Sequence, residues 1–206
     1  MTKRFLHGMA VICIVFSAIG MGCKKEEPKG QAPLPKTAVK VGPVGGYQVI
    51  SGTLEKGGLG FVLSSEKDKA GVAFKRVEPP FKNSVTVKGK MKAAVPSGVR
   101  NGFITFTGYF PDKKVRSSKA GILIGQKVYT IDGALVGKVE KPANFDQAKV
   151  FDLELTVSLK EKTVKFTVDG QSLKTKISEM PLSLTHIGLA NSGTKTEFSE
   201  LQISGD

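Results

Sequence analysis

The sequence predicts an all-β protein folded as a two-sheet antiparallel sandwich, on the strength of three observations. Residues 149–203 alternate apolar and polar side chains in successive short segments, as strands with one buried face do. No segment of useful length repeats its apolar residues with the period of an amphipathic helix. The 24 glycines and 10 prolines act as turn residues between the strand-like segments.

Short strands are predicted in the first half of the domain. A first strand is expected over residues 47–56, up to the glycine pair at 57–58. Strands at 61–63 and 72–74 follow, and Pro79-Pro80 is expected to mark a connection because proline interrupts strand pairing. Residues 84–93 then alternate cleanly. Their inward side chains are Val85, Val87, Met91 and Ala93, and their outward ones include Lys88, Lys90 and Lys92.

The second half of the domain carries the clearest pattern. Residues 103–110 are apolar on both sides and are expected in a central strand, whereas 111–119 are expected to form a basic loop. A strand or pair of strands over 120–131 and another over 135–139 precede two long strands. Their predicted core residues are Phe151, Leu153, Leu155, Val157, Val164, Phe166 and Val168. Asp169-Gly170 then tolerates the positive φ angles that a tight hairpin turn requires.

These segments resemble a known fold family. The strand ending in Val168-Asp169-Gly170, the run His186-Ile187-Gly188-Leu189 and the closing Phe198–Ile203 are similar to the last strands of concanavalin A-like jelly-roll domains. Tyr47–Leu54 resembles their first strand. The similarity is to domains of bacterial secreted proteins, including the 3-keto-disaccharide hydrolase family, and spans most of residues 46–206. It implies a jelly-roll sandwich and, through that family, a glycan-acting function. The chain departs from the family in having no Trp, with which these domains usually begin and often stack on sugars.

Residues 1–22 predict a signal peptide. Thr2-Lys3-Arg4 is basic, and the apolar run of 11 residues from Met9 to Ile19 is too short to span a bilayer. Gly20-Met21-Gly22-Cys23 resembles the lipobox of bacterial lipoproteins, in which Cys23 would carry the lipid, although Gly20 stands where Leu is usual. Residues 23–45, rich in Lys, Pro and Gly, predict a flexible tether. We therefore expect a lipid-anchored protein of the bacterial cell envelope, outside the cytoplasm. Cleavage by the ordinary signal peptidase, which gives a secreted protein, is the alternative.

The charge of the domain favours anionic partners. Residues 46–206 hold 24 of the 31 basic and 16 of the 18 acidic residues, a net charge of +8. No nucleic-acid-binding motif accompanies this surplus, so no nucleic-acid partner is expected. Lys88, Lys90 and Lys92 form a predicted face for an anionic polymer, and a solvated face that guards against edge pairing is the alternative. Cys13 and Cys23 both precede the domain, which therefore has no internal disulfide.

The sequence shows no catalytic or metal-binding pattern. His7 lies in the signal peptide and His186 stands alone within a strand, without zinc spacing or a serine elbow. Glycoside hydrolysis needs two carboxylates at a defined separation, and Asp152-Leu153-Glu154 is the nearest approach. Asn144 and Asp146 are weak calcium candidates for which solvated loop residues are the simpler interpretation. We expect no catalytic residue, no metal and no cofactor.

A glycan site without a metal relies on aromatic platforms beside hydrogen-bonding groups. The grouping that fits is Arg100, Asn101, Tyr109, Asp112, Arg116 and Tyr129, and partial burial of the two tyrosines is the alternative. The sequence therefore predicts a surface-tethered, non-catalytic concanavalin A-like module that binds a glycan or another envelope component. A glycan-acting hydrolase of the 3-keto-disaccharide type and a structural envelope lipoprotein are the alternatives.

Overall fold

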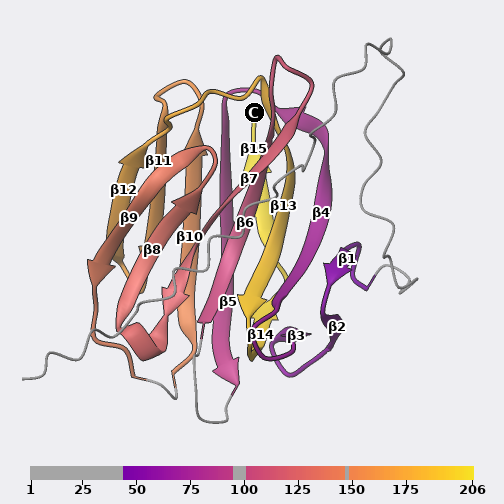
Figure 1. The fold of residues 1–206 in the computed structure, drawn as a ribbon, viewed down its shortest axis with the longest axis vertical. Coiled ribbons are helices and arrows are strands. Elements are labelled where there is room, and N and C mark those ends of the chain that lie inside the picture. The colour runs from indigo at the N-terminus through magenta and orange to yellow at the C-terminus, as the bar shows by residue number, and fades with distance from the viewer. Residues whose placement is uncertain (1–43, 95–100, 147–148) are drawn as a thin grey trace, which may run out of the picture. The chain divides into compact units, whose positions relative to one another are not determined.

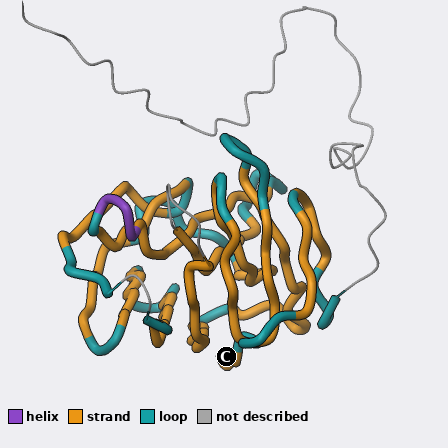
Figure 2. Tube along the Cα trace, turned by 90° about the horizontal axis from the view of Figure 1, so that it is seen from below, coloured by secondary structure: helices purple, strands orange, loops and turns teal. Residues whose placement is uncertain are grey.

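A computed structural model describes residues 44–94, 101–146 and 149–206. Antiparallel strands dominate this part of the chain (Figure 1), and its one helical segment is the short 3-10 turn η1 (Ile124–Gln126; Figure 2). The predicted all-β class is therefore confirmed. Within the described ranges, no helix has the length and apolar character needed to cross a membrane. The predicted signal peptide, Cys23, most of the tether and Arg100 lie outside the described residues.

The strands form two sheets. One sheet has seven strands, in the spatial order β1 (Gln48–Ser51), β4 (Ala70–Phe81), β13 (Ser183–Ser192), β6 (Asn101–Tyr109), β7 (Val115–Leu123), β8 (Val128–Gly133) and β9 (Val136–Pro142). The other has eight, in the order β12 (Gln171–Lys176), β11 (Thr163–Val168), β10 (Phe151–Ser158), β5 (Ser84–Ala94), β14 (Lys195–Ser199), β3 (Gly60–Ser64) and β2 (Thr53–Lys56), with β15 (Gln202–Gly205) also paired to β5. Strands β6 to β9 and strands β10 to β12 are consecutive meanders in different sheets (Figure 1).

The core lies between the sheets and contains every side chain that the alternation predicts. All seven predicted core residues of β10 and β11 are 3% exposed or less: Phe151, Leu153, Leu155, Val157, Val164, Phe166 and Val168. Leu155 pairs with Phe166 of β11 on one side and with Val87 of β5 on the other. The register of these three strands therefore directs one apolar face inward, as the period of two requires.

Two glycine positions set the course of the chain. At the predicted hairpin turn between β11 and β12, Asp169 and Gly170 have φ angles of 46° and 83°, which confirms the turn. The predicted first strand, in contrast, is two strands, because the chain passes from one sheet to the other at Gly52. Gly52 has a φ of 77°, and a Cβ there would collide with the carbonyl oxygen of Ser64, so only glycine fits.

Tyr47, which precedes β1, is fully buried and packs edge-on against Phe61 with ring centroids 5.3 Å apart. Burial raises the pKa of its hydroxyl. Tyr47 thus occupies the core as a structural residue.

Two predicted connections are wrong. The basic loop expected over 111–119 ends at residue 114, because residues 115–119 belong to β7 and pair with β6 from Val115 opposite Tyr109 onward. Pro79-Pro80 lies inside β4 instead of ending it. There the partner strand β13 shifts register between Leu184 and His186, so the prolines fall where the ladder is already interrupted.

Candidate functional site

The structure divides the predicted glycan-binding group between the two ends of β6. Asn101 begins β6 and Tyr109 ends it, which separates them by roughly 26 Å at the rise of a strand. Tyr129 belongs to the Asn101 end, because it pairs with Ile122, the partner of Gly102. Asp112 and Arg116 belong to the Tyr109 end. The five described residues of this group therefore do not form one site, and the two halves require separate description.

Asn101 links β6 to β13. Its side-chain amide donates to the carbonyl of Ser192 and accepts from the Ser192 N–H, both at 2.8 Å. Its backbone carbonyl accepts from the hydroxyl of Thr196 at 2.6 Å. Because Asn101 is 1% exposed and all its side-chain hydrogen-bonding groups are directed at the protein, its role is structural.

Tyr129 is also a core residue. It is 1% exposed, and its hydroxyl donates to the side chain of Gln171 at 2.7 Å. Its ring packs 5.9 Å from that of Phe145, which lies 5.4 Å from Phe151 at nearly a right angle. These side chains, with Asn144, border a hollow of about 200 Å³. Because Tyr129 is packed within this aromatic group, it offers no open ring face on which a sugar could stack.

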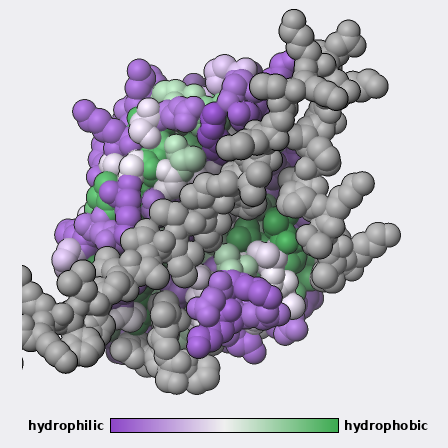
Figure 3. All heavy atoms as spheres, in the orientation of Figure 1, coloured by the Kyte–Doolittle hydropathy of each residue, from purple (hydrophilic) through white to green (hydrophobic). Residues whose placement is uncertain are grey.

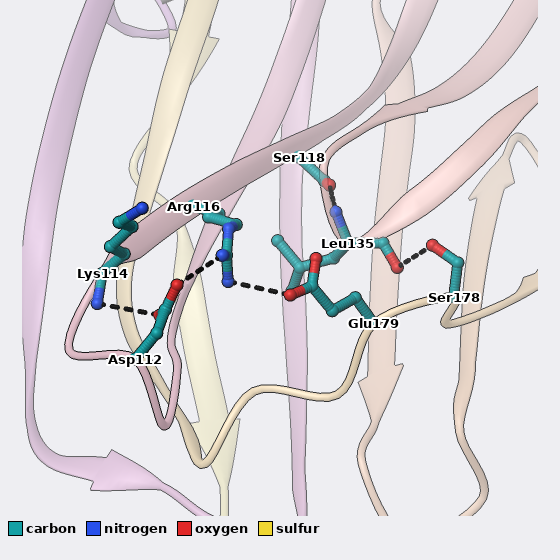
Figure 4. A network of polar contacts seen from close by, with 7 residues as sticks. All are labelled: Asp112, Lys114, Arg116, Ser118, Leu135, Ser178 and Glu179. Carbon is teal, nitrogen blue, oxygen red and sulfur yellow. Dashed lines mark hydrogen bonds and ion pairs between the residues drawn. The ribbon is translucent and has the colours of Figure 1, made fainter. Parts of the chain in front are cut away.

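Arg116 holds together the Tyr109 end of the sandwich (Figure 4). Its guanidinium bonds Asp112 at 2.6 Å and Glu179 at 2.9 Å, and lies over the ring of Phe110 at 4.3 Å. Although desolvation opposes the shift, the N–H of Lys114 and the charge of Arg116 lower the pKa of Asp112. Through its ion pairs with Asp112 and Glu179, the guanidinium connects the turn after β6 to the segment before β13.

A different set of side chains meets on the outer face of the seven-stranded sheet. Across four adjacent strands, the register places Arg76 (β4), His186 (β13), Thr107 (β6) and Ser117 (β7) side by side. Phe74 lies two residues from Arg76 and Tyr109 two residues from Thr107, on the same face. We name this set the Arg76–His186 cluster: Phe74, Arg76, Thr107, Tyr109, Ser117 and His186.

The cluster combines aromatic surface with polar groups. The rings of Phe74 and His186 meet edge-to-face with centroids 6.1 Å apart, and both are half-buried. Arg76 is exposed beside them and pairs with Glu78 at 2.9 Å. Desolvation by burial, reinforced by the positive charge of Arg76, lowers the pKa of His186. His186 therefore favours the neutral imidazole, which can both donate and accept a hydrogen bond.

Hydroxyl groups line the same face. Thr107 and Ser117 share a hydrogen bond of 2.9 Å across β6 and β7, and Ser117 is exposed. Thr105, two residues before Thr107, is 6% exposed, and its hydroxyl has no hydrogen-bond partner among the described residues. A Cβ on the opposite residue, Gly188, would lie 2.8 Å from the Thr105 hydroxyl and 2.8 Å from the Phe74 ring. Because the Thr105 hydroxyl is buried from solvent, the exposed hydroxyl of this face is that of Ser117.

Apolar side chains extend the margin of the cluster at Tyr109. Val115, paired with Tyr109 across β6 and β7, is 56% exposed. Leu182, whose N–H donates to the Tyr109 carbonyl at 2.7 Å, is also 56% exposed. Figure 3 shows one side of the molecule, where hydrophobic patches lie between hydrophilic residues. The cluster therefore offers apolar contact and hydrogen-bonding groups together, which is the composition of a ligand site.

This cluster could not be predicted from the order of residues along the chain. Arg76 and His186 are neighbours only because β4 and β13 pair, although 110 positions separate them in the chain. Tyr109 was predicted as a ligand residue, and the structure places it here beside Thr107. Phe74 and Arg76 were missed, because an alternating strand shows that they share a face and does not show which strand lies next to them.

The three lysines of β5 point outward as predicted, but acids face them. Lys88 pairs with Glu154 at 3.3 Å and Lys90 with Asp152 at 2.9 Å, both on β10. Lys92 is directly opposite Glu197 of β14. The binding of an anionic polymer to these lysines stays a prediction, and it would have to compete with the acids of the neighbouring strands.

A hollow of about 630 Å³ lies over these strands on the outer face of the eight-stranded sheet. Its charged lining residues are Lys88, Lys90, Asp152, Glu154, Asp169 and Glu200. Every carboxylate among them has a lysine partner, with Asp169 bound by Lys149 at 3.0 Å and Glu200 by Lys75 at 3.3 Å. Across the described part of the chain, no three His, Cys, Asp or Glu side chains lie together in an arrangement that could hold a metal ion.

No protein-family model and no curated protein matches the sequence. Solved structures do share its fold. The carbohydrate-binding module CBM66 from Bacillus subtilis aligns with a TM-score of 0.61 at 11% identity, over 78% of this chain and 96% of that chain. The fold is a jelly-roll sandwich. A Bacillus subtilis protein of unknown function with a galectin-like fold aligns with a TM-score of 0.57 at 9% identity, over 78% of this chain and 89% of the other. The family 7 alginate lyase A1-II' aligns with a TM-score of 0.54 at 11% identity, over 74% and 83%.

At such identities these likenesses establish the fold alone. They confirm the predicted concanavalin A-like class and leave the resemblance to the 3-keto-disaccharide hydrolase family as a prediction.

Proposed function

We propose that the protein is a non-catalytic carbohydrate-binding lipoprotein of the bacterial cell envelope, which contacts glycan through the Arg76–His186 cluster. The observation that carries the proposal is the meeting of an aromatic pair, a guanidinium and the hydroxyl pair of Thr107 and Ser117 on one outer sheet face. Sugars present apolar ring faces and many hydroxyls, and this surface offers partners for both. The likeness to a carbohydrate-binding module of Bacillus subtilis supports the proposal at the level of the fold.

The anchor is the second part of the proposal. Cys23 follows a short apolar run and small residues, and the Lys-, Pro- and Gly-rich residues 24–45 separate it from the first strand. A lipid on Cys23 would hold the sandwich near the membrane surface while the tether allows it to reach envelope glycan. The domain itself would then need affinity for glycan and no catalytic group.

A glycan-acting hydrolase, as the resembling family implies, is disfavoured by the acids that the structure brings together. Asp152 and Glu154 are the nearest pair in sequence, and each is bound by a lysine of β5. An enzyme would nevertheless be recognised at once, because it would release new reducing ends or unsaturated sugars from a bound polysaccharide with time.

The test is a glycan array with the purified full-length protein, followed by affinity measurements on the bound glycans. Phe74→Ala and Arg76→Gln are expected to weaken binding about tenfold or more, because they remove the apolar contact and the guanidinium. Phe145→Ala is the matched control, since Phe145 is also half-buried but lies in the hollow beside Tyr129. Equal affinity of all three variants would place the glycan elsewhere. Release of sugar products would show that the protein is an enzyme and not a binding protein.

A further inference from the structure

Five of the described lysines without an ion pair lie close together in the fold, at β11, β12 and the turn before β11. Among the residues that the structure describes, no ion pair involves the lysines of the turn between β10 and β11 or of strands β11 and β12. We name these the lysine patch: Lys160, Lys162, Lys165, Lys174 and Lys176. All five are exposed. The patch is separate from the Arg76–His186 cluster, which lies on the other sheet.

Three lysines of the patch lie on one outer face, at opposite and diagonal positions of two paired strands. Lys165 of β11 is directly opposite Lys174 of β12. Lys176 is opposite Thr163 and therefore diagonal to Lys165 on the same face. Side chains directly opposite have their Cβ atoms about 5 Å apart, and like charges at that spacing repel and destabilise the sheet. An anion between the ammonium groups would relieve this repulsion.

The surroundings of the patch do not supply that anion. Asp152 and Glu154 on the adjacent β10 are bound to Lys90 and Lys88. Glu161, in the turn, stands between two lysines of the chain, and Asp206 is hydrogen-bonded to Ser84 at 2.7 Å. Hydroxyls fill the positions between the lysines. They are Thr156 opposite Lys165, Thr163 opposite Lys176, and the pair Thr167 and Ser172, which share a hydrogen bond of 2.9 Å.

Protection of a sheet edge explains only part of this pattern. Lysines on an edge strand prevent pairing with another chain, and β12 is the edge strand that carries Lys174 and Lys176. Lys165, however, lies on β11, which is paired on both sides. Edge protection therefore does not explain why Lys165 lies directly opposite another lysine.

We propose that the lysine patch binds an acidic polysaccharide through the carboxylate groups of the polysaccharide. Charge complementarity selects an anion, and the intervening threonine and serine hydroxyls suit a polymer that also carries hydroxyls. A lipid surface fits less well. The large exposed hydrophobic side chains among the described residues are Ile50, Val115 and Leu182. None of them lies on β10, β11 or β12, so the patch has none to insert among lipid chains. This inference does not rest on the Arg76–His186 cluster, and either can fail without the other.

The chain supplies a matched pair of variants for the test. Lys165→Gln/Lys174→Gln/Lys176→Gln removes three charges from the patch, and Lys88→Gln/Lys90→Gln/Lys92→Gln removes three charges from β5. Both change the net charge by the same amount. We would measure binding of the full-length protein to polygalacturonate, to neutral dextran and to phosphatidylglycerol vesicles, each at low and at physiological salt.

The patch variant is expected to lose about tenfold or more of its affinity for polygalacturonate at low salt, and the β5 variant less than about threefold. The melting temperature of the patch variant should equal or exceed that of the wild type, because the repulsion between the lysines is removed. If the patch variant is unstable, Lys165→Arg/Lys174→Arg/Lys176→Arg, which keeps the charges, should bind as the wild type does. Equal losses in the two triple Gln variants would show that net charge alone governs binding and would overturn the proposal. So would binding to the vesicles without binding to polygalacturonate.

Discussion

Replacing Phe166 by Ala tests the register of β11, on which the lysine patch depends. Phe166 is fully buried at the centre of β11, where Leu155 of β10 and Leu173 of β12 lie directly opposite. The substitution removes most of an aromatic side chain from between the sheets and leaves a cavity. Its outward neighbours on the same strand, Lys165 and Thr167, stay in place, so the change is confined to the core face.

The expected loss is about 3–5 kcal/mol of unfolding free energy, the sum of the lost transfer free energy and the cavity. A single domain has about 5–15 kcal/mol in total, so the variant keeps only part of its stability. For a sandwich of this size the melting temperature should fall by roughly 6–20 °C. Chemical denaturation gives the free energy directly, and circular dichroism at far-ultraviolet wavelengths should show a strand spectrum for both proteins before unfolding.

Thr167→Ala is the control, because Thr167 is the next residue and points outward to Ser172. Its effect should stay within about 0.5 kcal/mol, as for a surface substitution. If Phe166→Ala changed stability no more than Thr167→Ala, the strand would have slipped by one residue. A slip of one residue turns every side chain to the other face and would remove Lys165 from the outer surface.

Three further predictions concern single side chains. Arg116→Met should lower the unfolding free energy by about 1–2 kcal/mol in chemical denaturation, because it removes a cation–π contact with Phe110 and two partly exposed ion pairs. A variant as stable as the wild type would show that these contacts contribute nothing to stability. The folded state lowers the pKa of His186, so the unfolded state binds its proton more tightly, and stability should decline as pH falls below about 6.5. His186→Gln should flatten this decline in melts across that range, and an imidazole that titrates by NMR at or above the free value would contradict the shift. Cys23→Ser should abolish metabolic labelling with palmitate, and equal labelling of wild type and variant, or none in either, would indicate a secreted protein.

The strands of the second half could be predicted from the sequence because their information is local. In β10 and β11, each side chain alternates between core and solvent, and Asp169-Gly170 supplies the φ angles of the turn between β11 and β12. Local alternation also identified the outward lysines of β5. It failed at Gly52 and at residues 115–119, where the choice of sheet or partner strand decides the structure.

Neither surface could be derived from sequence, because each depends on which strands lie together. Arg76 meets His186 only through the pairing of β4 with β13. Lys88 and Lys90 are balanced only because β10 places acids opposite them, whereas Lys165 meets Lys174 across β11 and β12. The grouping around Tyr109 was chosen by closeness in sequence, and an antiparallel strand of nine residues separated its members.

The measurement that tests the central claim most directly is an NMR titration of the ¹⁵N-labelled protein with the glycan that binds best on the array. The account predicts shifts in the amide signals of Phe74, Thr107 and His186, with the imidazole of His186 shifting as well. Signals of β10, on the other sheet, should stay in place. Shifts confined to the residues around Asp152 and Glu154, or no shifts at saturating glycan, would contradict it.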